Sequence, residues 1–411
     1  MTVQNLVLEN GMRVVLAPCE AESIAFGLFV ASGSRHETAK TAGISHFIEH
    51  MLFKGTPTRT ALDITQAVEG RGGHINAFTG VEKTVYYAHM PSDYLAEMID
   101  LLSDIYLRAT FPADEFAREK GVILEEIKMY DDDPSSVALE KLQSCLYPDS
   151  MLGMSVAGTP ASLTPMTPRD LKRDKALRYR PDNTIAILVG RFDPETARRE
   201  MARRFPRRAW AKAVAAPKKE TFRRIIRESV VRRDIKQAQL ALGYRMGGFN
   251  ASAKTQYAIS LMAAILGRGA MSRLFQEVRE KRGLCYDISA RPSPFRETGY
   301  FAITAGVDMK NRAALVKTID REIARICDHR VGPEELKRTK DFIIGNFRLS
   351  HENVLAKLYF LGYSMLSYGR IISVDEQVKD LRAVTADDVQ AVAREVFRPA
   401  RRVMSWVLPK E

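Results

Sequence analysis

The sequence has no run of apolar residues approaching the roughly 18 that a membrane span requires, so we expect no transmembrane segment. Its first residues, MTVQNLVLENGMRVVLAP, lack the basic start and unbroken apolar stretch of a secretory signal, and they are not rich in arginine and serine as transit peptides are. The 4 cysteines, Cys19, Cys145, Cys285 and Cys327, form no CxxC pair and show no disulfide spacing. These absences exclude a disulfide scaffold and predict a cytoplasmic protein with no membrane partner.

Acidic residues are fewer than basic ones, 50 against 62, which gives a formal net charge of +12. Most of the excess lies between Arg198 and Lys236, where 15 Lys or Arg stand against 4 Asp or Glu. The centre of this segment, RRFPRRAWAKAVAAPKKETFRR, has two prolines, several alanines and little periodicity, which is typical of an exposed linker. A nucleic-acid-binding patch is the alternative, but no nucleic-acid-binding motif accompanies it, and we expect no nucleic-acid partner.

The 411 residues are enough for two domains of roughly 200 residues each. The basic linker, 206–224, divides the chain near its midpoint, and the two halves have the same order of helix, Arg-Gly turn, strand, hairpin, strand and long helix. The matching stretches are QAVEGRGGHINAFTG with TVYYAHM, and QEVREKRGLCYDISA with TGYFAITAG. Strands group with strands and helices with helices, so we predict the α+β class. The two repeated domains, 1–205 and 225–411, are each expected to be a mostly antiparallel sheet covered on one face by helices.

Histidines are few and unevenly distributed: five of the 7 lie in the first 89 residues. In GISHFIEHMLFKGT, residues 43–56, the spacing of His46, Glu49 and His50 places all three on one helical face. The matching helix of the second half, AISLMAAILGRGAMSRLF, has no histidine or acid on its apolar face. A purely structural role would need no such polar set in one copy only, so we favour a chemical role. Two core histidines and a solvated glutamate are the alternative.

Two histidines four residues apart on a helix can both bind one zinc ion. Glu49, on the same side, is placed to take a proton from water rather than to bind the metal. A catalytic zinc needs a third protein ligand, and AREKGVILEEIKMYDDDP offers Glu125 and Glu126. At about 100° per residue, Glu126 lies at the edge of the buried stripe and Glu125 points to solvent. Glu119, two turns earlier, can hold a ligand histidine by its second nitrogen; an ordinary surface ion pair is the alternative.

The HFIEH motif, with a glutamate 76 positions after its second histidine, resembles the inverzincin pattern of pitrilysin, insulin-degrading enzyme and mitochondrial processing peptidase. Counting from His50 gives Glu126, which the helical periodicity also favours. The resemblance covers the whole chain and is to the bacterial branch related to the processing peptidase. It implies a zinc-dependent endopeptidase with one zinc ion per chain, held by His46, His50 and Glu126, in which Glu49 activates water.

The resemblance also implies how a peptide substrate binds. The segment GGHINAFTG matches the edge strand on which the family adds its substrate as a further strand, and places Asn76 and Ala77 there. The segment REKRGLCY matches the family's Arg–Tyr pair, here Arg279 and Tyr286, which binds the substrate backbone and stabilises the oxyanion. For Asn76 alone, a plain turn-proximal strand residue is the alternative; without the resemblance, Arg279 would be an ordinary surface arginine.

Long members of this family contain four such domains, so the resemblance implies that two chains of this length make the complete assembly. The sequence carries both the zinc set and the Arg–Tyr pair, which favours a homodimer in which Arg279 and Tyr286 complete the site of the partner. A heterodimer with a related chain is the alternative. The resemblance also implies a closed chamber, and such a chamber implies peptides and unfolded small proteins as substrates. The competing reading is a non-catalytic member that acts as a structural or partner subunit.

Overall fold

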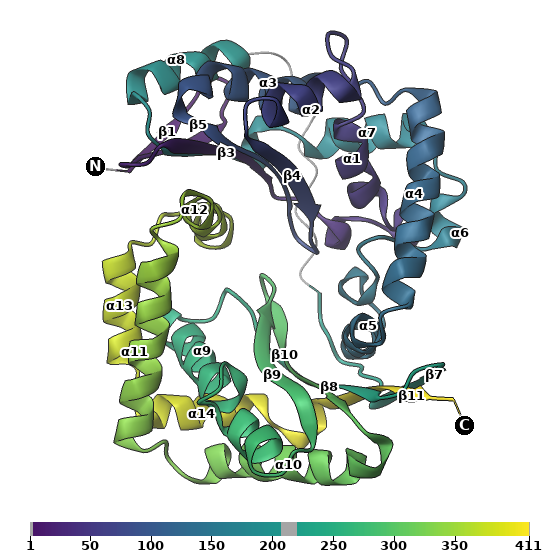
Figure 1. The fold of residues 1–411 in the computed structure, drawn as a ribbon, viewed down its shortest axis with the longest axis vertical. Coiled ribbons are helices and arrows are strands. Elements are labelled where there is room, and N and C mark those ends of the chain that lie inside the picture. Colours follow the sequence, from purple (N-terminus) through teal and green to yellow (C-terminus); the bar gives the residue numbers. More distant parts are fainter. Residues whose placement is uncertain (1–2, 207–219, 411) are drawn as a thin grey trace. The chain divides into compact units, whose positions relative to one another are not determined.

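The structure, a computed structural model, describes residues 3–206 and 220–410 (Figure 1). The chain divides into two compact units, and each unit collects segments from both halves of the sequence. Unit 1 comprises Met1–Ile127, Met154–Lys218 and Leu349–Ile371, and unit 2 comprises Lys128–Gly153, Lys219–Arg348 and Ile372–Glu411. This division differs from the predicted order of one domain, a linker and a second domain. The segment Leu349–Ile371 from the second half belongs to unit 1, and the segment Lys128–Gly153 from the first half belongs to unit 2. Most of the predicted linker 206–224 lies outside the described residues.

Unit 1 is built on a six-stranded sheet with the order β1-β2-β6-β3-β5-β4. The β2–β6 pair is parallel, and every other neighbouring pair is antiparallel. The turn between β1 and β2 contains the pair Asn10-Gly11, and Gly11 adopts a φ of 89°, which favours glycine. The strands are β1 (Gln4–Val7), β2 (Arg13–Pro18), β3 (Ser23–Val30), β4 (His74–Thr79), β5 (Thr84–Pro91) and β6 (Thr184–Gly190).

Most helices of unit 1 cover one face of this sheet. Alternate residues of the strands, such as Phe26 and Leu28 of β3, pack in one buried cluster with residues of the helices. This core holds the helix that carries the histidines and the helix that carries the acids against the same sheet. The helices are α1 (Ile44–Leu52), α2 (Ala61–Glu69), α3 (Leu95–Arg108), α4 (Ala113–Asp131, the last turn of which belongs to unit 2), α6 (Pro160–Leu163), α7 (Pro168–Arg178) and α8 (Pro194–Arg204).

The opposite face of the same sheet is covered by α12 (Val354–Tyr368), a helix from the second half of the sequence (Figure 1). Its apolar residues recur every three or four positions, as expected for a helix with one buried face, and they are Val354, Leu358, Leu361 and Met365. Two glycines allow the close approach. A Cβ on Gly27 of β3 would lie 3.2 Å from Cδ2 of Leu358, and a Cβ on Gly362 of α12 would lie 2.1 Å from the Phe29 ring.

Unit 2 repeats the same sheet. Its order, β7-β11-β8-β10-β9, matches β2-β6-β3-β5-β4 strand for strand, with the parallel pair at one end and antiparallel pairs elsewhere. The predicted duplicated α+β fold is therefore confirmed. The strands are β7 (Glu228–Arg233), β8 (Ala238–Gly247), β9 (Cys285–Pro294), β10 (Thr298–Val307) and β11 (Arg402–Pro409).

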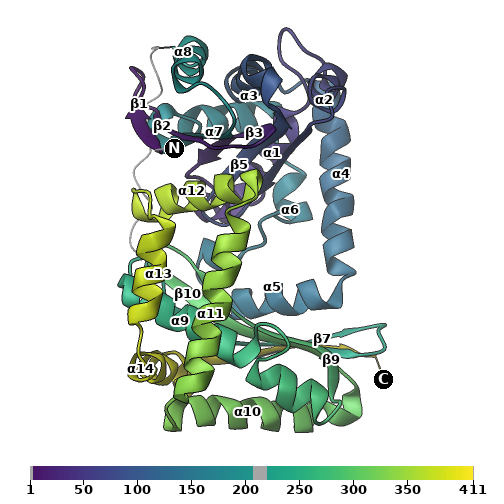
Figure 2. The same cartoon turned by 60° about the vertical axis from the view of Figure 1, so that its left-hand side comes forward.

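The second sheet also has helices on one face and a single exchanged helix on the other. That helix is α5 (Pro134–Leu146), which comes from the first half and contacts β8 and β11. Figure 2 shows α5 beside the sheet to which β7, β9 and β10 belong. Helix α5 occupies the same place in chain order as α12, and Gly243 of β8 makes room for Leu142 as Gly27 does for Leu358. The remaining helices are α9 (Ala253–Gly267), α10 (Arg312–Asp328), α11 (Pro333–Ser350), α13 (Val374–Ala383) and α14 (Ala386–Val396).

Every helix within the described residues is too short or too polar to cross a bilayer.

Candidate metal centre

The start of helix α1 is held in place by backbone and side-chain contacts. Gly43 precedes the helix with a φ of 89°, and a Cβ there would lie 2.5 Å from the carbonyl oxygen of Ala157, so only glycine fits. The buried carboxyl group of Glu37 accepts hydrogen bonds from the N–H groups of Gly43 and Ser45, each at 2.8 Å. Burial raises the pKa of Glu37 to about 7, although these hydrogen bonds lower it. The position of the histidine helix is thus set from outside the helix.

Helix α1 has an apolar face in the core and a polar face turned toward α4. Phe47, Ile48 and Met51 are fully buried, whereas His46, Glu49 and His50 are only partly buried. The Phe47 ring stacks on Phe116 of α4, with 4.6 Å between ring centroids. This contact ties the two helices together beside the site.

The structure brings His46, His50 and Glu126 together, although Glu126 lies 76 positions further along the chain than His50. One ligand atom from each lies within 4.8 Å of the others. The Oε2 atom of Glu126 is 3.7 Å from Nε2 of His46 and 3.4 Å from Nε2 of His50. The neighbouring Glu125 is exposed, as the helical periodicity predicts.

The second nitrogen of His50 is held by Glu119, also as predicted. Nδ1 of His50 is 3.0 Å from Oε2 of Glu119, and Nζ of Lys54 is 2.6 Å from the other carboxylate oxygen. Burial alone would raise the pKa of Glu119, but the hydrogen bonds from Lys54 and His50 outweigh it and lower the pKa below its ordinary value. Because an ionised Glu119 can only accept, Nδ1 of His50 is the donor in this hydrogen bond, and the neutral form of the ring then has its lone pair on Nε2.

The three residues fit a zinc ion. Ligand atoms about 2.1 Å from a tetrahedral zinc are separated by about 3.4 Å, close to the 3.4 and 3.7 Å found here. Two imidazoles and one carboxylate are also the ligand types that zinc takes in catalytic sites. Burial, with a smaller contribution from His50, lowers the pKa of His46 to about 4, so this ring is in the neutral form that binds metal. Three protein ligands would leave a fourth position on a bound zinc ion for water or substrate.

The carboxylate of Glu49 lies beside this group and is anchored by a strand. The hydroxyl of Thr79, at the end of β4, donates a hydrogen bond of 2.5 Å to Oε2 of Glu49. Burial raises the pKa of Glu49 above its ordinary value, and the hydrogen bond from Thr79 opposes that rise. A partly buried carboxyl group with a raised pKa is suited to accept and return a proton.

The predicted substrate strand is β4, which lies at the edge of its sheet. The bond from Gly80 N–H to the Lys83 carbonyl sets the alternation along the β4–β5 hairpin, so Ala77 and Thr79 point their main-chain groups away from β5. The outward N–H of Ala77 donates a hydrogen bond of 2.8 Å to Oδ1 of its neighbour Asn76. Asn76 thus covers one hydrogen-bonding position of the edge.

Arg279 and Tyr286 lie side by side in unit 2. The guanidinium of Arg279 is 4.6 Å from the centre of the Tyr286 ring and 4.7 Å from that of Phe275, so it lies near both aromatic rings. Arg279 belongs to a short π-helix, Phe275–Glu280. Tyr286 is 78% exposed and available for contact.

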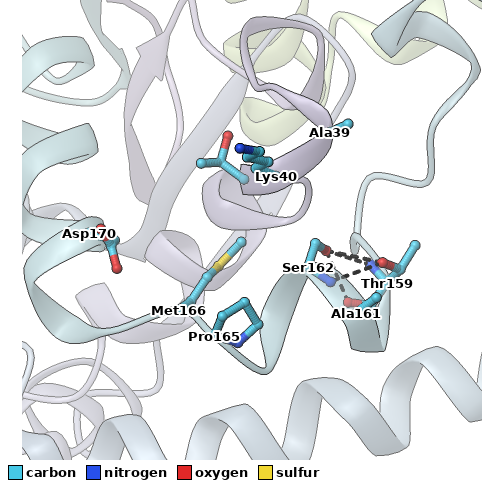
Figure 3. Close-up of a pocket in the computed structure, with 9 residues that line it drawn as sticks. Ala39, Lys40, Thr159, Ala161, Ser162, Pro165, Met166 and Asp170 are labelled. Atoms are coloured by element: carbon cyan, nitrogen blue, oxygen red, sulfur yellow. Dashed lines mark hydrogen bonds between the residues drawn. The ribbon is translucent and has the colours of Figure 1, made fainter.

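A surface pocket of about 490 Å³ lies elsewhere on unit 1, between the turn Ala39–Thr41, α6 and the start of α7 (Figure 3). Thr159 and Ser162 in its wall form the capping box at the start of α6, and Asp170 forms the capping box of α7 with Thr167. None of the predicted site residues lines it. Thr159, Ser162 and Asp170 are thus used at helix starts.

Four residues beside the predicted sites were not anticipated from the sequence: Glu37, Lys54, Thr79 and Phe275. A local signal existed for two of them. Lys54 follows His50 by four positions, just past the end of α1, and Thr79 follows Ala77 by two positions on the same face of a strand. Glu37 and Phe275 act through contacts that no spacing predicts.

Comparison with known families gives two matches that together cover most of the chain. Residues 13–160 match the family described as insulinase, peptidase family M16. Residues 165–342 match the peptidase M16 inactive domain. The second match agrees with helix α9, where no histidine or acid replaces the polar set of α1.

Individual relatives extend over nearly the full length. An uncharacterized zinc protease from Streptomyces coelicolor is 33% identical over 100% of this chain and 91% of its own. An uncharacterized zinc protease from Bacillus subtilis is 31% identical over 96% of both chains. The crystal structure of a protease from Helicobacter pylori superposes with a TM-score of 0.93 at 22% identity, covering 99% of each chain.

Proposed function

Because the chain belongs to the insulinase family of M16 peptidases, we propose that it is a zinc-dependent endopeptidase that hydrolyses peptides or unfolded small proteins. The observation that carries the proposal is the meeting of His46, His50 and Glu126 with the carboxylate of Glu49 alongside. A structural helix would not need this set.

The residues of the chain divide the chemistry among them. His46, His50 and Glu126 would hold a zinc ion, which would supply a Lewis acid able to polarise a peptide carbonyl and to lower the pKa of water. Glu49 accepts the proton of the attacking water and then delivers it to the leaving amine. Glu119 keeps His50 in the tautomer whose Nε2 is free to bind the ion.

The substrate is expected to bind as an added strand beside β4. Ala77 offers an outward N–H, which the incoming chain can take over once Asn76 releases it. The freed carboxamide of Asn76 can then donate to a substrate carbonyl. Such pairing uses the main-chain N–H and C=O groups of the substrate, which are unpaired in an extended peptide. An extended peptide, and not a folded surface, is therefore the proposed substrate class.

Arg279 and Tyr286 are proposed to bind the substrate backbone and to stabilise the oxyanion. Because the chain carries both this pair and the metal set, the proposed assembly is a homodimer in which each chain completes the other's site and encloses a chamber. The four cysteines are all free thiols, which supports a cytoplasmic location.

The test of the proposal is digestion of an unfolded peptide library, with zinc measured on the same sample. We expect about one zinc per chain, cleavage that a chelator abolishes and added zinc restores, and no cleavage by Glu49→Gln although its zinc is retained. Asp114→Asn is the control, because it makes the same change from carboxylate to carboxamide at an exposed position of unit 1 that is paired with Arg118. Peptide cleavage by Glu49→Gln at the normal rate would contradict the assignment of the base.

The competing function is a non-catalytic family member that serves as a structural or partner subunit. Absence of cleavage of the library, whether or not the protein contains zinc, would support this alternative.

The proposed dimer is tested by light scattering of the wild-type chain and by mixing inactive Glu49→Gln and Tyr286→Phe chains. If sites are shared between chains, the mixture should recover part of the activity that each variant lacks alone.

A further inference from the structure

The carboxylate of Glu49 has an unusual anchor for a residue on a helix: its hydrogen-bond donor comes from the edge of the sheet. Within residues 3–206 and 220–410, Thr79 is the residue that donates to this carboxylate, with 2.5 Å between its hydroxyl and Oε2. Thr79 is separated from Glu49 by 30 positions in the sequence. The contact therefore joins two elements, α1 and β4, that have separate roles in the proposed function.

Thr79 is placed to serve both elements because of the alternation of a β-strand. Its side chain points to the same face as Ile75 and Ala77, which pack against the core that includes α1. Its main-chain N–H and C=O point away from β5, toward the free edge of the sheet. Thr79 thus contacts Glu49 through its side chain and presents its main-chain groups at the free edge of β4.

We propose that Thr79 is a positioning residue that orients the carboxylate of Glu49 and couples it to the strand that receives the substrate. The proposal rests on the proposed function, since it assigns Thr79 a role through the base. A glutamate side chain has three rotatable bonds, so a hydrogen bond to Oε2 restricts the orientation of the carboxylate. A substrate strand paired to the outer edge of β4 also fixes the residue that holds the base.

The variants follow from the chemistry of the contact. Thr79→Val keeps the shape and the β-branch of the side chain but removes the hydroxyl, whereas Thr79→Ser keeps the hydroxyl. Thr84→Val is the matched control: Thr84 is the cross-strand partner of Thr79, and its hydroxyl donates to the Ser32 carbonyl instead. All variants are compared as full chains loaded with zinc, below their unfolding temperatures.

Cleavage of an internally quenched, unfolded peptide separates binding from chemistry. For Thr79→Val we expect kcat to fall roughly 10- to 100-fold, as for other small misplacements of a catalytic group, with KM changed by less than about twofold. Zinc content should equal that of the wild type. Thr79→Ser should restore kcat to within about threefold, and Thr84→Val should leave kcat unchanged.

A double variant tests whether Thr79 acts through Glu49. In the Glu49→Gln background, Thr79→Val should cause no further loss of the residual rate, because the group that it orients is already gone. A normal kcat in Thr79→Val, an equal loss in Thr84→Val, or a raised KM with unchanged kcat would each overturn the proposal. If Glu49→Gln is inactive and Thr79→Val is normal, this inference alone fails. If Glu49→Gln is active, the proposed function fails and the inference falls with it.

Discussion

The clearest quantitative prediction concerns Glu119, which touches the site only through His50. Replacing Glu119 by Gln keeps the shape of the side chain but removes the charge. The carboxylate is 9% exposed and binds both Nδ1 of His50 and Nζ of Lys54. The lysine is 26% exposed and can be rehydrated, so the lasting loss is the charge-assisted bond to His50. Losses of this kind cost about 10- to 100-fold in metal affinity, or about 1.4–2.7 kcal/mol.

Zinc affinity is measured by competition with a chromophoric chelator at fixed pH and ionic strength. We expect Glu119→Gln to release zinc at a chelator concentration about 10- to 100-fold lower than the wild type does. Asp114→Asn, on the same helix but paired only with surface groups, should behave as the wild type. Lys54→Met should show a smaller loss, and its effect should vanish in the Glu119→Gln background. Equal zinc affinity in Glu119→Gln and wild type would refute the idea that Glu119 holds the ligand ring.

Three further predictions follow from the packing of unit 1 and the aromatic contacts of unit 2. Gly362→Ala should lower the free energy of unfolding by about 1–3 kcal/mol in denaturant titrations, because its Cβ would overlap the buried Phe29 ring, whereas Gly121→Ala, which meets open space on α4, should not be destabilising. A fragment of residues 1–206 lacks α12, which covers one face of the sheet of unit 1, so it should bind a hydrophobic dye and aggregate. Fusion of residues 349–371 to this fragment should reduce both dye binding and aggregation. A soluble fragment that binds no dye would argue against the exchanged helix. Phe275→Leu should raise KM a few-fold with zinc content unchanged, since it removes one aromatic ring beside Arg279; an unchanged KM would show that the contact is not needed.

Much of the metal centre could be predicted from the sequence because it depends on helical periodicity. His46, Glu49 and His50 share a face by spacing alone, and the same angle arithmetic separates Glu126 from Glu125. The contact of Glu119 with His50 also followed from its place two turns before Glu126. These are local relations within a helix, and the α-helical geometry hardly varies.

The exchange of helices could not be predicted. The spacing of Val354, Leu358, Leu361 and Met365 shows that α12 has a buried face, but an apolar stripe does not specify which sheet it covers. Both sheets offer an equivalent glycine, Gly27 and Gly243, with room for a leucine. Chain order would favour packing of each helix on the sheet of its own half. In the folded chain, α5 packs on the sheet of unit 2 and α12 on the sheet of unit 1.

The sequence by itself determined the class of the fold, the duplication, and a set of two imidazoles and a carboxylate of the kind that binds zinc, because these follow from periodicities of 3.6 and 2 and from residue type. Only the tertiary structure decided which helix covers which sheet, and that Thr79 holds Glu49 and Lys54 holds Glu119. The physical reason is that contacts between separate elements depend on how side chains fill a shared space, which neither spacing nor composition records.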